Sequence, residues 1–96
     1  VLGTPYYMSP EQVRGEPLDP RSDLYSLGVI FFQMITGKHM FEGTTAAGIA
    51  AQHLTTSAPP LPESFAGLQR LYSRLIAKDR EERFQSAREL YGYIAV

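Results

Sequence analysis

The chain has 96 residues, with ten acidic residues against nine lysines and arginines, and it contains no cysteine. This length allows one domain, and the lack of cysteine excludes a disulfide scaffold and a thiolate metal site. The net charge of −1 argues against a nucleic-acid partner. The hydrophobic fraction of 44% is typical of a globular chain, and no apolar stretch is long enough to span a bilayer. We therefore expect a soluble, compact piece of protein.

The first helical signal in the chain is short. Ser9 suits the N-cap of a helix and Pro10 its first position, and Gln12 can complete a capping box. Gly15 and Pro17 follow almost at once, and both interrupt helices. We therefore predict a helix of only a few residues.

The strongest helical pattern begins at Ser22 and Asp23, runs to about Thr36 and stops at Gly37. One apolar stripe at helical spacing contains Leu24, Leu27, Phe31, Met34 and Ile35. The other faces are largely apolar too, so this helix expects burial on nearly every side. A chain of this length offers little material to surround it, and we expect it to be part of something larger.

Weaker patterns fill the rest of the chain. Residues 45–54 favour a helix with a weak point at its glycine, and the prolines in residues 55–62 favour an extended connector. The helical period is clean over residues 65–78. After a charged link, Ser86 and Glu89 form a second capping box that opens the last helix. No persuasive strand pattern occurs, so we predict a mainly α fold.

Spacing alone indicates no active site. The sequence Gly37-Lys38-His39 ends like a phosphate-binding loop but lacks the earlier glycine and the Ser/Thr. His39 and His53 have no acidic or sulfur neighbours at metal-ligand spacing, so we predict no metal site. No GxSxG motif supports a hydrolase triad.

The order of three motifs is more specific. Residues Gly3 to Glu11 read Gly-Thr-Pro-Tyr-Tyr-Met-Ser-Pro-Glu and resemble the end of the activation segment of Ser/Thr protein kinases. The sequence from Asp23 to Gly28, Asp-Leu-Tyr-Ser-Leu-Gly, resembles the opening of the family's central buried helix. The stretch 78–84 is similar to the family's Lys-Asp-Pro-x-x-Arg-Phe/Tyr pattern. The exact residues of these motifs most resemble those of bacterial Ser/Thr kinases of the eukaryotic-like type.

The resemblance implies that residues 1–96 are part of a protein kinase domain, within its helical C-terminal lobe. The parent protein would transfer the γ-phosphoryl group of ATP, with Mg²⁺, to Ser or Thr of a protein substrate. The chain lacks the glycine-rich loop, the strand lysine, the His-Arg-Asp loop and the Asp-Phe-Gly motif. We therefore expect this piece to be inactive alone, to bind neither ATP nor Mg²⁺, and to pair with the remainder of the domain. A cytoplasmic location is implied, while membrane anchoring of the parent is left open.

The resemblance also implies roles for individual residues. The loop that positions the substrate would consist of Gly3, Thr4, Pro5, Tyr6 and Tyr7. The Thr4 hydroxyl would contact the catalytic aspartate and lysine of the parent, although this chain has no catalytic residue itself. Glu11 and Arg83 would form a buried ion pair, and Asp23 would accept hydrogen bonds from backbone amides of the catalytic loop. Without those amides, Asp23 should be solvated or cap its own helix.

Simpler interpretations remain open for the same residues. Thr4 is also an ordinary extended residue before a proline, and Tyr6 and Tyr7 suit simple packing. Glu11 suits the first turn of a helix through the helix dipole, and Arg83 suits a solvated charged link.

Two positions depart from the family pattern. Arg80 stands where a proline is usual before the arginine, and Met40 stands where a proline commonly precedes Phe41. Both are expected in loops, so we expect them to alter local loop shape.

A non-catalytic helical interaction module, either a kinase remnant or a domain-swapped piece, is the alternative function. Its basis is the apolar helix over residues 23–36, which requires a partner. We expect the isolated chain to be aggregation-prone, oligomeric through exposed apolar surface, or partly molten.

Overall fold

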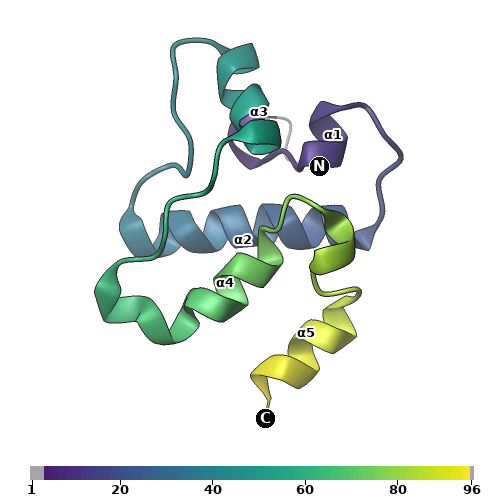
Figure 1. The fold of residues 1–96 in the computed structure, drawn as a ribbon, viewed down its shortest axis with the longest axis vertical. Coiled ribbons are helices and arrows are strands. Elements are labelled where there is room, and N and C mark those ends of the chain that lie inside the picture. Colours follow the sequence, from purple (N-terminus) through teal and green to yellow (C-terminus); the bar gives the residue numbers. More distant parts are fainter. Residues whose placement is uncertain (1–3, 96) are drawn as a thin grey trace.

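The computed structural model describes residues 4–95, which form helices joined by loops (Figure 1). No strand occurs among these residues, so the predicted mainly α fold is confirmed. In chain order the elements are the 3₁₀ helix η1 (Pro5–Tyr7), α1 (Pro10–Val13), α2 (Pro20–Thr36), α3 (Ala46–Thr55), the 3₁₀ helix η2 (Glu63–Leu68), α4 (Gln69–Leu75), the 3₁₀ helix η3 (Arg80–Glu82) and α5 (Ala87–Ile94).

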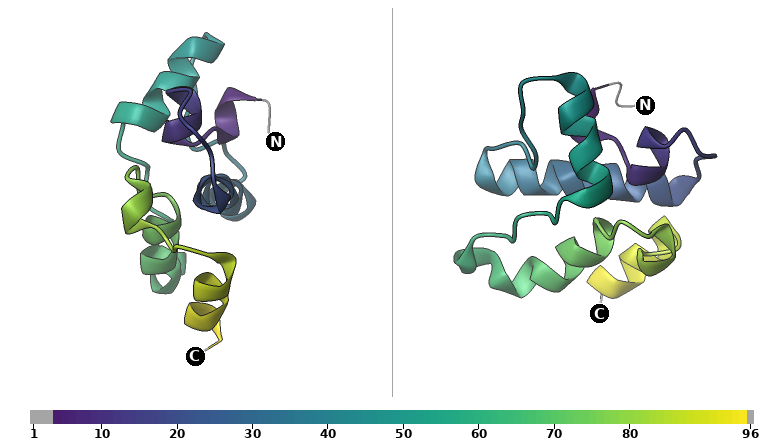
Figure 2. Two further views of the ribbon diagram at one scale, coloured as in Figure 1. Left: turned by 90° about the vertical axis from the view of Figure 1, so that its right-hand side faces the viewer. Right: turned by 45° about the horizontal axis from the view of Figure 1, so that its top comes forward.

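The long helix α2 lies at the centre of the arrangement, with the other elements on two sides of it (Figures 1 and 2). The elements η1, α1 and α3 lie on one side, where η1 contacts both α2 and α3. On the opposite side α4 packs against α2, and α5 follows it toward the C-terminal end. None of the helices in residues 4–95 has the length and apolar character needed to cross a bilayer.

Local signals set both ends of α2. Asp19 caps its N-terminus, where the carboxylate Oδ1 accepts from the Arg21 backbone N–H at 2.8 Å, and Pro20 occupies the first turn. The helix thus begins before the predicted Ser22, because Asp19 and Pro20 form the stronger cap. The predicted stop at Gly37 is confirmed: its φ of 72° lies in the left-handed region that glycine adopts without strain.

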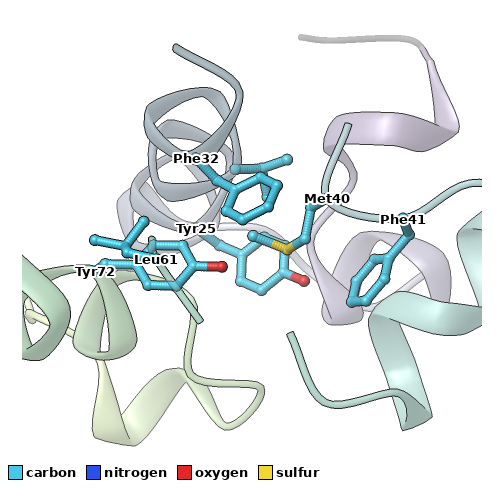
Figure 3. Packing of buried hydrophobic residues seen from close by; sticks show 7 residues of the cluster. Tyr25, Phe32, Met40, Phe41, Leu61 and Tyr72 are labelled. Atoms are coloured by element: carbon cyan, nitrogen blue, oxygen red, sulfur yellow. The ribbon is translucent and has the colours of Figure 1, made fainter. Parts of the chain in front are cut away.

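The core lies between α2, α4 and the loop that follows α2 (Figure 3). Its buried members are Tyr25, Val29, Phe32, Met40, Phe41, Leu61 and Tyr72. The rings of Phe32 and Tyr72 stack with their centroids 5.9 Å apart, and the Tyr72 hydroxyl donates to the Pro59 carbonyl at 2.8 Å. Met40 therefore serves as a core residue, 5% exposed, where a proline is usual.

The apolar stripe predicted for α2 packs into the core only in part. Leu24 is buried, and Phe31 and Ile35 pack against the core, whereas Leu27 is 45% and Met34 is 79% exposed. The prediction was wrong for Leu27 and Met34 because a helix that is apolar all round has no unique phase, and its neighbours decide which face is buried. We also expected α2 to be buried on nearly every side, and within residues 4–95 it is not, because Leu27 and Met34 stay exposed.

The later elements differ from the predicted continuous helix over residues 65–78. The chain first forms η2, departs from helical geometry at Phe65 (φ −112°, ψ 21°) and then forms α4, which ends at Leu75. The predicted cap of the last helix is present, since Ser86 Oγ accepts from the Glu89 backbone N–H at 3.0 Å. No residue of α5 is fully buried, but Leu90 packs against the cluster that contains Phe84, and the Tyr93 ring meets Phe84 edge-on with centroids 5.4 Å apart. Tyr91 and Ile94 stay exposed among the described residues.

Gly28 allows α4 to approach α2 closely. A Cβ atom at this position would lie 2.5 Å from Ile76 Cγ2 and 2.9 Å from Leu75 Cβ. The same contact brings Leu24 of α2 together with Leu75 and Phe84 in a second buried cluster. The absence of a side chain at Gly28 thus decides the spacing of the two helices.

Gly28→Ala is expected to lower the free energy of unfolding by about 1–3 kcal/mol, because the added methyl group overlaps α4. Gly92→Ala is the matched control: nothing lies within 4 Å of its Cβ position, and the change favours α5 by up to about 1 kcal/mol. Thermal unfolding of the full-length protein that contains this chain measures both. A Gly28→Ala variant as stable as the unmodified protein would contradict the close helix contact.

Candidate functional site

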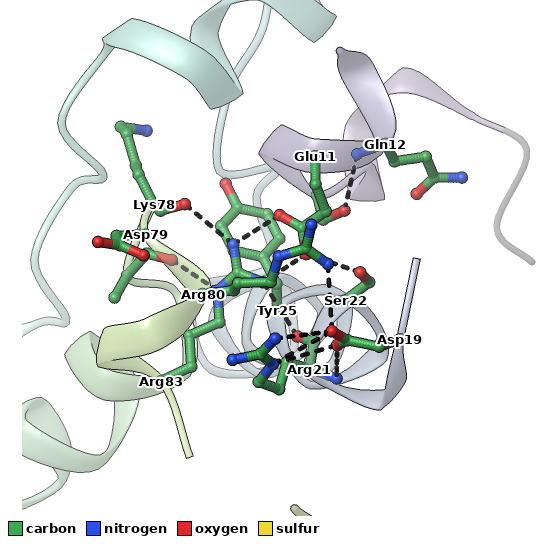
Figure 4. A network of polar contacts seen from close by, with 12 residues as sticks. Glu11, Gln12, Asp19, Arg21, Ser22, Tyr25, Lys78, Asp79, Arg80 and Arg83 are labelled. Atoms are coloured by element: carbon green, nitrogen blue, oxygen red, sulfur yellow. Dashed lines mark hydrogen bonds and ion pairs between the residues drawn. The ribbon is translucent and has the colours of Figure 1, made fainter. Parts of the chain in front are cut away.

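Glu11 and Arg83 lie 72 positions apart in the chain and form a buried two-pronged ion pair (Figure 4). Arg83 Nη1 donates to Glu11 Oε2 at 2.7 Å, and Nη2 donates to Oε1 at 2.9 Å. The Glu11 side chain is 1% exposed and the Arg83 side chain is 0% exposed. The pair joins α1, which Ser9 caps through its hydroxyl, to the turn that follows η3.

The rest of the Arg83 guanidinium also has partners. Its Nε donates to the Ala77 carbonyl at 2.7 Å, and Nη1 and Nη2 donate to the carbonyls of Arg21 at 3.1 Å and Lys78 at 3.1 Å. The guanidinium carbon lies 5.0 Å from the centroid of the Tyr25 ring. Every N–H of the guanidinium is therefore hydrogen-bonded, which offsets the cost of burying its charge.

The Glu11 carboxylate is held in its ionised form. Ser22 Oγ donates to Oε2 at 2.6 Å, next to the hydrogen bonds from Arg83. Burial opposes ionisation, but the hydrogen bonds from Arg83 and Ser22 outweigh it and lower the pKa of Glu11 to about 2. The pair is thus fully charged at neutral pH.

A second ionic cluster lies beside this pair and includes Arg80. Arg80 Nη1 donates to Asp19 Oδ2 at 3.1 Å and to the Pro17 carbonyl at 3.0 Å. Arg21 Nη2 donates to the same carboxylate at 2.8 Å, and hydrogen bonds from Arg21 are the main cause of an Asp19 pKa of about 2. Arg80 therefore ties the loop before α2 to the turn that carries Arg83, a contact that proline could not make.

The segment predicted to position a substrate lies at the surface. Gly3 lies outside the described residues. Thr4 is exposed and extended, with φ −99° and ψ 149°. Tyr6 and Tyr7 are partly buried within the 3₁₀ turn η1.

The backbone of this segment is anchored to both α3 and α2. His53 Nε2 donates to the Pro5 carbonyl at 2.9 Å, and Ser26 Oγ donates to the Tyr7 carbonyl at 2.6 Å. The Tyr7 hydroxyl also donates to Gln33 Oε1. Two helices thus hold the main chain on either side of Tyr6.

His53 is a site residue that the sequence analysis did not identify. Its side chain is 0% exposed, and the Tyr25 hydroxyl lies 2.7 Å from its Nδ1. Because the Pro5 carbonyl only accepts, the proton must be on Nε2, and Tyr25 donates to Nδ1. Burial lowers the pKa of His53, and the nearby charge of Lys78 lowers it further, so the ring is neutral. Its place on the apolar side of the residue 45–54 pattern was the one available signal.

Asp23 lies apart from these buried groups, at the surface of α2. Its side chain is exposed, and Asp19 rather than Asp23 caps the helix. Asp23 borders a surface pocket of about 260 Å³ that Ser22, Ser26 and Leu27 also line. This face of α2 is accessible to another segment of protein.

The hydrogen bonds from His53 and Ser26 hold a surface loop in place. Among residues 4–95 no group of three His, Cys, Asp or Glu side chains is placed to hold a metal ion. Glu11 and Arg83 bind each other, Glu11 also accepts from the Ser22 hydroxyl, and Arg83 also donates to backbone carbonyls. The Glu11–Arg83 pair is therefore suited to hold the neighbouring segment around η1 in a fixed position.

Comparison with known proteins gives a consistent picture. The protein kinase domain family matches residues 1–92. The probable serine/threonine-protein kinase PknB of Bifidobacterium longum is 43% identical over 93 residues, which cover 93% of this chain and 14% of that protein. Serine/threonine-protein kinase pkn3 of Myxococcus xanthus is 46% identical over 93 residues (91% of this chain, 17% of that protein). Serine/threonine-protein kinase PknB of Mycobacterium tuberculosis is 38% identical over 96 residues, which cover 94% of this chain and 15% of that protein. The chain thus spans under a fifth of these relatives.

Glu11→Ala is expected to lower the free energy of unfolding by about 3–5 kcal/mol, because it leaves the buried Arg83 charge without its partner. Glu16→Ala is the control, since Glu16 pairs with Arg14 at the surface, where such pairs contribute about 0–1 kcal/mol. Chemical denaturation of the full-length protein that contains this chain measures both. Equal effects of the two substitutions would contradict the stabilising role of the buried pair.

Stability is expected to fall on acidification in two separate pH windows. The unfolded chain takes up a proton on His53 below the ordinary pKa of 6.5, whereas the folded chain resists it, so stability declines from there downward. The contribution of Glu11 is complete above its ordinary pKa of 4.5 and is lost as the pH falls toward about 2.

Unfolding measured between about pH 3 and pH 8 tests this expectation. His53→Phe should remove the slope that begins near 6.5 and keep the slope that begins near 4.5. A variant that retains both slopes would show that His53 is not the group that titrates.

Proposed function

The chain belongs to the protein kinase family, and we propose that it forms part of the helical lobe of a Ser/Thr protein kinase. The intact enzyme transfers the γ-phosphoryl group of ATP to a Ser or Thr hydroxyl of a protein substrate. The printed names of the bacterial relatives, all serine/threonine-protein kinases, support this choice of acceptor. The observation that carries the proposal is the surface segment around η1, which is held from two helices and is joined to a buried Glu11–Arg83 pair.

In this proposal residues 3–7 position the substrate. Thr4 is exposed, its backbone is extended, and its hydroxyl caps no helix among residues 4–95, which suits contact with the catalytic aspartate and lysine of a neighbouring loop. The anchored carbonyls of Pro5 and Tyr7 support the role, because a loop that orients a substrate must keep its own shape.

Asp23 joins this piece to the catalytic loop of the same domain. We propose that its exposed carboxylate accepts hydrogen bonds from backbone amides of that loop. The exposed side chains of Leu27 and Met34 on α2 then pack against the remainder of the domain. Glu11 and Arg83 have a structural role in this proposal, because their ion pair fixes the start of α1 relative to the turn after η3.

ATP and Mg²⁺ do not suit the residues of this chain. Mg²⁺ needs clustered oxygen ligands, and residues 4–95 hold no group of acidic side chains that could bind a metal ion. The sequence also lacks the glycine-rich loop and lysine that hold the nucleotide phosphates in kinases. We therefore assign both to other parts of the proposed domain and propose that this piece is inactive alone.

A non-catalytic interaction module is the second candidate. Met34 is 79% and Leu27 is 45% exposed on α2, so this helix has apolar surface that a partner or a second copy could cover. The two candidates differ in whether the full-length protein transfers phosphate.

The test is phosphorylation of Ser- and Thr-containing peptides by the full-length protein that contains this chain, with Mg²⁺ and ATP. Thr4→Ala is expected to lower kcat on the order of 10²-fold, because it removes the hydroxyl that orients the catalytic loop. Thr4→Ser keeps that hydroxyl and should retain most of the activity.

A folded full-length protein without any phosphoryl transfer would favour the interaction module. Equal activity of the unmodified protein and Thr4→Ala would keep the kinase function and contradict the role of Thr4.

A further inference from the structure

His39 stacks on Tyr6 of the substrate-positioning segment. The two rings lie nearly parallel, with their centroids 3.7 Å apart and an interplanar angle of 11°. The Tyr7 ring meets His39 edge-on, with centroids 6.2 Å apart and an angle of 67°. His39 belongs to the loop after α2, between Gly37 and the core residue Met40, so it reaches the segment from a rigid support.

We infer that His39 is a positioning residue for Tyr6, and that it shapes the pocket for the substrate residue that follows the phosphoacceptor. The inference rests on the proposed kinase function and deepens it. His39 lies outside the three kinase motifs, which end at Gly28 and resume at Lys78.

The hydrogen bonds of the segment leave the Tyr6 ring to be fixed by something else. His53 and Ser26 hold the carbonyls of Pro5 and Tyr7, which restrain the main chain but not the side-chain torsions between them. A parallel ring on Tyr6 restricts those torsions through an aromatic contact. The Tyr7 ring meets Tyr6 only edge-on, at 6.4 Å, so the closer and parallel His39 ring is the main restraint on the direction of the Tyr6 ring.

The contact depends on the flat ring of His39 rather than on its nitrogens. The Nδ1 atom is buried and has no hydrogen-bond partner among the described residues. A polar atom of this kind can be replaced by an apolar group of the same shape with little loss. Phenylalanine should therefore substitute for His39, whereas alanine should not.

The pocket proposed here has an aromatic wall, because the Tyr6 and Tyr7 rings meet edge-on with their centroids 6.4 Å apart. Both rings are partly buried, and His39 backs Tyr6 with another ring. An aromatic wall favours an apolar substrate side chain and disfavours a charged one, which would lose water without gaining a partner. We expect the intact enzyme to prefer peptides with an apolar residue directly after the acceptor.

The experiment measures steady-state kinetics of the full-length protein and its His39→Ala, His39→Phe and Lys38→Ala variants. The peptides differ only in the residue after the acceptor, which is apolar in one and acidic in the other. His39→Ala should raise KM for the apolar peptide roughly 2- to 10-fold with little change in kcat, so that discrimination between the peptides shrinks. His39→Phe should restore the KM, and Lys38→Ala, at an exposed neighbour, should not alter it.

A double substitution separates positioning from general stability. In a Tyr6→Leu background, His39→Ala should have no further effect on KM, because the ring it positions is gone. Additive effects of the two substitutions would overturn the inference, as would equal loss of kcat with both peptides. If the unmodified protein phosphorylates no peptide, the proposed function fails and this role with it. If it is active and His39→Ala matches it, only the role of His39 fails.

Discussion

A carboxylate and a guanidinium buried together tie the two ends of this chain to each other. Removing Glu11 and Arg83 from water costs several kcal/mol per ion, and the cost is offset only while both groups keep their partners. Bidentate geometry, Ser22 and the carbonyls of residues 21, 77 and 78 supply those partners. The start of α1 is thereby held against the turn after η3, and the segment before α1 inherits that rigidity.

From this pair a line of contacts reaches the surface. The Arg83 guanidinium lies over the Tyr25 ring, the Tyr25 hydroxyl bonds to His53, and His53 donates to the Pro5 carbonyl. Each member has a partner on both sides, which is what buried polar groups require. The segment around η1 thus depends on buried groups from α2, α3 and the link after α4.

The departures from the family pattern become parts of this arrangement. Met40 fills the core where a proline is usual, and its unbranched side chain suits an irregular space. Arg80 uses donors that proline lacks to bind Asp19 and the Pro17 carbonyl. Both changes keep the loops in place by a different contact, so the fold tolerates them without loss of the buried pair.

Interactions within a few residues could be predicted from the sequence, and those across the chain could not. The caps at Ser9 and Ser86 and the stop at Gly37 are local, because side chain and backbone meet within one helical turn. The order of motifs also indicated the family and the residues Glu11 and Arg83 without reference to coordinates. The tertiary structure alone decided that α2 buries Tyr25 and exposes Met34, and that His53 serves the loop. Tyr25 binds His53, 28 positions away, and His53 binds the carbonyl of Pro5, 48 positions away. No helical or strand period in the sequence connects residues at such separations.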